Sequence, residues 1–140
     1  MSAAIPRIFR LTMCHRSMSM ARSDRQPLPN AAGTSLIART ANNRLGAVIS
    51  SLYSFWIARQ AALSNNAQLG AHRRDAYSII FFSKQPLTCV ENDFTSSPDE
   101  LLTACLRYRP YQNEIYILAI KKAQDIMNLH WSTERCGILV

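Results

Sequence analysis

The run from Tyr77 to Ser83, YSIIFFS, constrains the fold most strongly because nearly every position in it is apolar. A strand with one face in water alternates apolar and polar side chains, whereas a strand covered on both faces is apolar almost throughout. The run therefore predicts a strand inside a parallel or mixed sheet that has structure packed on both faces.

Three other short apolar runs predict further strands. They span Ile8 to Cys14, Leu87 to Val90 and Cys136 to Val140. The turn-forming sequence at residues 84–86 separates the second of these from the central run by only a few residues. We therefore expect these two strands to form a hairpin.

Helix patterns lie between the strands. Asn42 and Asn43 can cap a helix that runs to about Leu63, and a capping box of Ser97 and Glu100 predicts a helix over residues 98–106. A longer helix is predicted over residues 115–129. The expected buried stripe of the first helix is Leu45, Val48, Ile49, Leu52, Phe55 and Trp56, and that of the last is Tyr116, Ile120, Ala123, Ile126 and Met127.

Helices that alternate with apolar strands indicate an α/β layered fold. We predict a Rossmann-like doubly wound sheet of about four strands with helices on both faces. Residues 1–7 form an N-terminal tail, residues 8–140 form the domain, and residues 21–41 form a loop rich in proline and polar residues.

The chain is basic, with 16 Lys and Arg against 9 Asp and Glu. Its first 30 residues contain five arginines and only Asp24 as an acid. An anionic partner or a mitochondrial targeting segment would explain this excess, but a solvated basic surface is the simpler interpretation. Aromatic residues do not interleave with these arginines, so we expect no nucleic-acid partner. No apolar window is long enough to predict a membrane span.

The four cysteines, Cys14, Cys89, Cys105 and Cys136, are spread singly along the chain. Zinc sites favour closer pairs, and a disulfide framework would accompany a secretory signal, which the N-terminus lacks. We therefore expect reduced thiols in an intracellular, cytoplasmic protein, with most of the cysteines acting as small core residues.

The order, spacing and local sequence of these elements resemble the von Willebrand factor A-type (vWA) family over residues 8–140. The resemblance lies in NRLGAVISSLYSFWIAR at Asn43 to Arg59, RDAYSIIFF at Arg74 to Phe82, residues 91–102, and AIKKAQDIM at Ala119 to Met127. It implies a metal-ion-dependent adhesion site on three loops at the carboxyl ends of the strands. There, two serines, a threonine and two aspartates hold Mg²⁺, which prefers hard oxygen ligands.

The resemblance places His15 at the first aspartate, Ser17 and Ser19 at the two serines, and Glu114 at the threonine. The sequence ends at Val140, before the position of the last aspartate. Two hydroxyl groups cannot hold Mg²⁺ against its hydration shell, so we expect no cofactor and a degenerate site. Such a chain resembles a C-terminally truncated domain, with its last strand at an unprotected sheet edge and marginal stability.

No catalytic residues are predicted, because no Ser/His/Asp arrangement, nucleophile elbow or nucleotide-binding loop is present. We predict a non-enzymatic module that binds a protein partner, without metal, through the face that carries Ser17, Ser19 and the Glu114 loop. Two alternatives remain open. The chain is either a truncated or degenerate fragment without independent function, or a vWA domain that retains weak Mg²⁺ binding at Ser17 and Ser19.

Overall fold

The computed structural model describes residues 8–16, 18–21, 36, 37, 39, 42–65, 75–83, 86–110, 115–131 and 136–139. Its centre is a four-stranded mixed sheet with the order β3-β2-β1-β4. The strands are β1 (Ile8–His15), β2 (Asp75–Phe82), β3 (Pro86–Asp93) and β4 (Cys136–Leu139). β1 pairs in parallel with both β2 and β4, whereas β3 is antiparallel to β2. The predicted hairpin is therefore confirmed, and it makes the sheet mixed.

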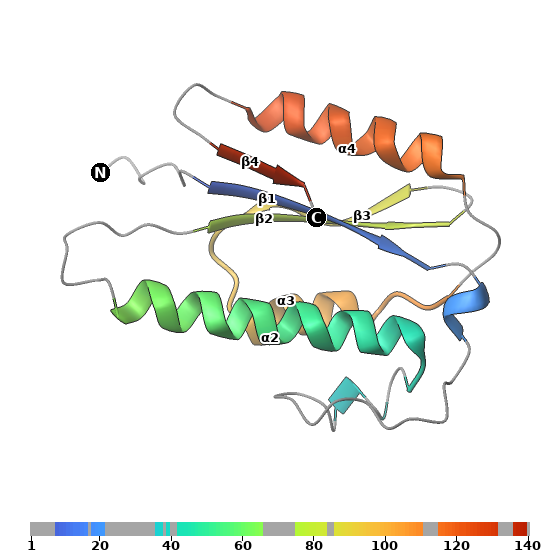
Figure 1. The fold of residues 1–140 in the computed structure, drawn as a ribbon, viewed down its shortest axis with the longest axis horizontal. Helices are drawn as coiled ribbons and strands as arrows, with labels where there is room; N and C mark the ends of the chain where they lie inside the picture. Colours follow the sequence, from blue (N-terminus) through green and yellow to red (C-terminus); the bar gives the residue numbers. More distant parts are fainter. Residues whose placement is uncertain are drawn as a thin grey trace.

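Helices cover both faces of the sheet (Figure 1). α2 (Arg44–Asn65) and α3 (Pro98–Cys105) pack on one face, and α4 (Tyr116–His130) crosses the other. β2 is buried along almost its whole length, as its apolar sequence predicts. The chain thus has the α/β architecture expected from the sequence, in an arrangement compatible with a Rossmann-like fold.

The core has two parts, one on each side of the sheet. The larger part lies under α2 and α3 and contains Cys14, Leu45, Ile49, Tyr53, Trp56, Ile79, Phe81, Leu101, Leu102 and Cys105. The smaller part lies under α4 and contains Leu11, Ala76, Ile80, Ala123 and Ile126. The alternation of side chains along β1 and β2 divides these residues between the two faces.

The two predicted helix caps, at Asn43 and Ser97, are confirmed by their hydrogen bonds. The Asn43 side chain accepts a hydrogen bond from the Gly46 amide at 3.0 Å. The Ser97 amide donates to Glu100 Oε2 at 2.7 Å, and the Glu100 amide donates to Ser97 Oγ at 3.3 Å. This second pair is the reciprocal capping box that the sequence indicates.

The predicted buried stripe of α4 was partly wrong. Ala119, Ala123 and Ile126 face the sheet, whereas Tyr116 and Ile120 are 54% and 57% exposed. Residues 115–120 are apolar around most of the helix, so the spacing alone does not select a face. Small alanine side chains let the helix lie close to the sheet, and this packing sets its rotation.

The stripe predicted for α2 also needs one correction. Tyr53 is buried in the core, and Phe55 is 39% exposed, with the Arg10 guanidinium 5.3 Å from the centre of its ring. Within the segment expected to be a loop, Ala21 closes the short helix η1 (Met18–Ala21). Residues 36, 37 and 39 are helical, and Ile37 is fully buried.

Candidate functional site

The candidate site lies at the carboxyl ends of β1 and β2, the end of the sheet at which α4 begins (Figure 1). The chain leaves β1 toward α2 on one face and returns to β4 from α4 on the other. Sheets with this reversal bind ligands in the crevice outside the carboxyl ends of the strands, where neighbouring connections diverge. The reversal lies between β1 and β4, so the topology directs attention to this end of the sheet, where the described residues follow β1 and β2.

Arg16, directly after β1, connects three segments at this end of the sheet. Its amide donates to the carbonyl of Phe82 at 2.9 Å, which ties the end of β1 to the end of β2. Its Nη1 donates to the carbonyl of Arg109 at 3.2 Å, and its guanidinium lies 6.0 Å from the centre of the Tyr108 ring. Tyr108 in turn stacks on Phe81 at 4.5 Å. These contacts hold the segment after α3 against the strand ends and leave Arg109 at the surface.

The start of α4 is attached to the same strand ends. The Ile115 amide donates to the carbonyl of Ser83 at 2.9 Å, and the Tyr116 ring packs edge-on against Phe82 at 5.4 Å. Ser83 itself is buried, and its hydroxyl has no hydrogen-bond partner among the described residues. Phe82 and Ser83 therefore anchor the first turn of α4, whereas Phe81 and Arg16 anchor the segment that carries Arg109.

Apolar side chains are exposed around the first turns of α4. Ile117 is 74% exposed, and its neighbours on the same turns also reach solvent. We call this set the α4 apolar patch; its members are Ile115, Tyr116, Ile117, Leu118 and Ile120. The arginines that lie after α3 at this end, Arg107 and Arg109, are both exposed. The candidate site thus combines exposed apolar surface with cationic side chains.

The residues predicted from the vWA resemblance are only partly described. His15 is the last residue of β1, and Ser19 is exposed on η1. Ser17, Glu114 and the His15 side chain lie outside the described residues. In the part of the chain that the structure describes, no three His, Cys, Asp or Glu side chains are grouped to hold a metal ion. Metal binding at Ser17 and Ser19 therefore stays a prediction.

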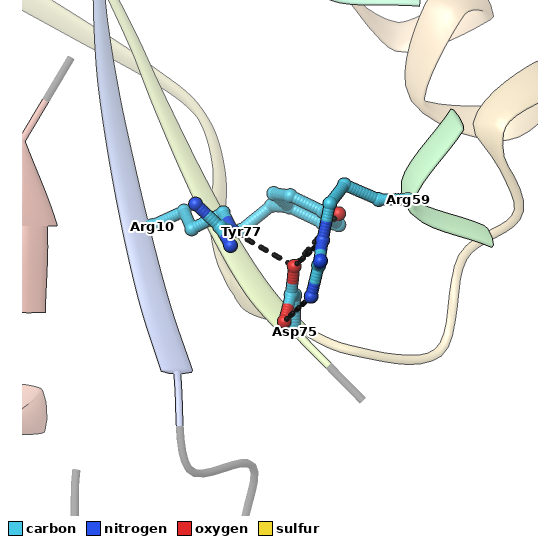
Figure 2. Close-up of polar contacts among 4 residues, drawn as sticks. All are labelled: Arg10, Arg59, Asp75 and Tyr77. Carbon is cyan, nitrogen blue, oxygen red and sulfur yellow. Dashed lines mark hydrogen bonds and ion pairs between the residues drawn. The ribbon is translucent and has the colours of Figure 1, made fainter. Parts of the chain in front are cut away.

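A buried ion-pair cluster lies at the opposite end of the sheet, where β1 and β2 begin (Figure 2). The Asp75 side chain is only 2% exposed and accepts from Arg10 Nε at 2.7 Å and from Arg59 Nε at 2.8 Å. Arg59 Nη2 also donates to the second carboxylate oxygen at 3.2 Å, so this pair is bidentate. The Tyr77 hydroxyl lies 3.5 Å from Asp75.

The electrostatics of this cluster favour a charged Asp75. Burial by itself would raise the pKa of Asp75, but the hydrogen bonds from Arg59 and Arg10 outweigh it and hold the pKa below its usual range. Burial and the negative charge of Asp75 raise the pKa of Tyr77 to about 12. The cluster joins β1, β2 and α2, and we interpret it as structural. Local sequence patterns do not reveal it, because its members are far apart in the chain.

No model of a known protein family matches the chain, and no curated protein matches it. The vWA resemblance therefore rests on the order, spacing and local sequence of the elements. Among the described helices, none is both long and apolar enough to cross a membrane.

Proposed function

We propose that this chain is a non-enzymatic, vWA-like protein-binding module that takes an acidic and apolar segment of a partner protein, without metal, at the carboxyl ends of β1 and β2. The observation that carries the proposal is the α4 apolar patch, which lies at the end of the sheet where folds of this class bind ligands. Arg107 and Arg109 are exposed at the same end of the sheet, after α3.

The α4 apolar patch favours a protein as the ligand. Single exposed apolar residues are common on protein surfaces, but contiguous groups rimmed by polar residues mark interaction sites. Four exposed apolar residues in the first turns of α4, with Ile115 directly before them, form such a group. A partner that covers Ile117 would remove a largely exposed side chain from water, which is worth about 1.5–3 kcal/mol for a fully buried residue.

The charge of the chain favours an acidic partner. Its net charge of +7 attracts anionic surfaces over a distance. At close range, arginine binds a carboxylate with two parallel hydrogen bonds. Arg109 is exposed, and its backbone is held by Arg16, so its guanidinium projects from a fixed point.

We propose binding without metal because of the residues that the vWA resemblance aligns with the family's metal ligands. In that alignment His15 replaces an aspartate and Glu114 replaces a threonine. Imidazole is a poor ligand for Mg²⁺ compared with a carboxylate. We infer that arginine takes over the role of contacting the partner's carboxylate directly.

Selection from a displayed library of random peptides tests the proposal. We expect enriched peptides to combine Asp or Glu with large apolar residues and to bind equally well in EDTA and in Mg²⁺. Ile117→Ser should weaken binding by about tenfold to a hundredfold, and Arg109→Glu should also weaken it. Leu129→Ser is the matched control, because Leu129 is 71% exposed at the other end of the same helix. Binding that needs Mg²⁺, or that Leu129→Ser weakens as much as Ile117→Ser, would contradict the proposal.

A further inference from the structure

The fold brings three cysteine side chains into one region of the larger core. Cys14 is on β1, Cys89 is on β3, and Cys105 is the last residue of α3. Cys14 and Cys105 are fully buried, whereas Cys89 is half-buried at the border of this core. Cys89 packs against the core cluster that contains Cys105, and the two thiols lie close enough for each to shift the pKa of the other. The sequence, in which these residues are separated by a helix start and a loop, gives no sign of this pairing.

A β-bulge explains how Cys89 reaches this position. Ile79 pairs with Val90 and Ile80 pairs with Thr88, so Cys89 is the extra residue of the bulge. Successive residues of a regular strand point to opposite faces, but Cys89 and Val90 both pack against the core under α2 and α3. The bulge thus turns Cys89 toward the end of α3.

The surroundings of Cys89 differ from those of the other thiols. The hydrogen bonds from Cys105 and Tyr108 and the nearby charge of Arg107 lower the pKa of Cys89, although partial burial opposes them. Burial and the neighbouring Cys89 raise the pKa of Cys14 to about 12. The bond to Cys89 and burial raise the pKa of Cys105 well above its usual range. Of these three thiols, Cys89 is the one that reaches solvent and whose pKa is lowered.

We propose that Cys89 and Cys105 form a reversible disulfide when the protein meets a hydroperoxide, with Cys89 as the attacking sulfur. The Cys89 thiolate attacks the peroxide oxygen, the O–O bond breaks, and hydroxide or alkoxide leaves and takes up a proton. The Cys105 sulfur then attacks the resulting sulfenic acid, the S–O bond breaks, and water leaves with the Cys105 proton. Two thiols are oxidised to one disulfide, and the peroxide is reduced to water and water or alcohol.

The crosslink would join β3 to the end of α3, directly before the segment that carries Arg107 and Arg109. The alternative interpretation is that Cys89 and Cys105 are in contact only because both pack as small core residues, without redox chemistry. The two interpretations differ in what peroxide does to the folded chain, and mass spectrometry separates them.

The test uses the full chain, reduced, freed of reductant, treated with hydrogen peroxide and then quenched with an alkylating agent. Residues 85–107 contain both cysteines and form one tryptic peptide, because Lys84 and Arg107 bound it and no Lys or Arg lies between them. We expect this peptide to lose two hydrogens and to resist alkylation. Cleavage at Glu91 or Glu100 should leave the two halves joined until dithiothreitol is added.

Variants separate the roles of the two sulfurs. In Cys105→Ser, Cys89 should accumulate as a sulfenic acid that dimedone traps, whereas Cys89→Ser should leave the peptide unmodified. Cys136→Ser is the control and should still form the crosslink. A wild-type peptide that stays fully alkylated after peroxide would overturn the proposal even if a variant fails to fold. A crosslink from Cys89 to Cys14 or between two chains would also overturn it.

Discussion

Asp75 offers a sharp test of how this fold is held together, because one buried carboxylate binds two guanidiniums from different elements. Asp75→Asn keeps the size of the side chain and removes its charge. The amide has a single acceptor oxygen, so it cannot accept from Arg10 and bind Arg59 through both oxygens as the carboxylate does. Arg10 and Arg59 would then remain partly buried without a counter-charge.

The expected cost follows from the burial of the three side chains. Removing one partner of a buried ion pair costs about 3–5 kcal/mol. The Arg10 and Arg59 side chains keep 14% and 28% exposure, so water partly compensates them. We therefore expect the free energy of unfolding to fall by about 3 kcal/mol, the lower end of that range. For a chain of this length the melting temperature should fall by about 10 °C.

Urea unfolding, followed by the fluorescence of buried Trp56 and by circular dichroism, measures this change. Asp125→Asn is the matched control, because Asp125 is exposed on α4 and the same chemical change there should cost less than about 0.5 kcal/mol. If Asp75→Asn were no more destabilising than Asp125→Asn, the ion-pair cluster would not stabilise the fold.

The difference in the free energy of unfolding between wild type and Asp75→Asn should change with pH in one direction. The folded protein holds the pKa of Asp75 below its ordinary value of 3.8. The stability that the charged group contributes is therefore fully present above that value and is lost as the pH falls through the lower, folded value. The gap between wild type and Asp75→Asn should be constant near neutral pH and should shrink below pH 3.8. A gap that widens in acid would contradict this assignment.

Three further predictions concern single sites. Ser97→Ala removes the capping box with Glu100 and should lower stability by about 1 kcal/mol in urea unfolding; no change would mean that the cap is not formed in solution. Ser83→Ala removes a buried hydroxyl without a hydrogen-bond partner among the described residues, so the melting temperature should stay the same or rise; a clear fall would reveal a partner for this hydroxyl. Isothermal titration with MgCl₂ should detect no micromolar binding, whereas binding that disappears in Ser17→Ala would contradict the metal-free proposal.

Much of the fold follows from local patterns in the sequence. The apolar run at β2, the capping box before α3 and the short hairpin connection each depend on neighbouring residues, and each was predicted close to its observed place. The rotation of α4 was predicted only in part. It depends on how closely Ala119 and Ala123 approach the sheet, which a helix with apolar residues on most sides does not reveal.

The contacts that the sequence could not reveal join distant parts of the chain. Arg10 and Asp75 are 65 residues apart, and a charged pair carries no periodic signal. The approach of Cys89 to Cys105 depends on a bulge that shifts the register of β3. Asp75, at the start of an otherwise apolar strand, was the available signal for the ion-pair cluster, because a buried acid requires a partner.

Amide chemical-shift mapping with a peptide selected from the library tests the proposed binding site most directly. The uniformly ¹⁵N-labelled chain would be titrated with the peptide in EDTA. We predict that the largest shifts fall on Arg16, on residues 107–109 and on the α4 apolar patch, with small shifts at the Asp75 end and at the last turn of α4. Shifts centred on residues 125–131 or on the Asp75 cluster, or shifts that appear only after Mg²⁺ is added, would contradict the proposal.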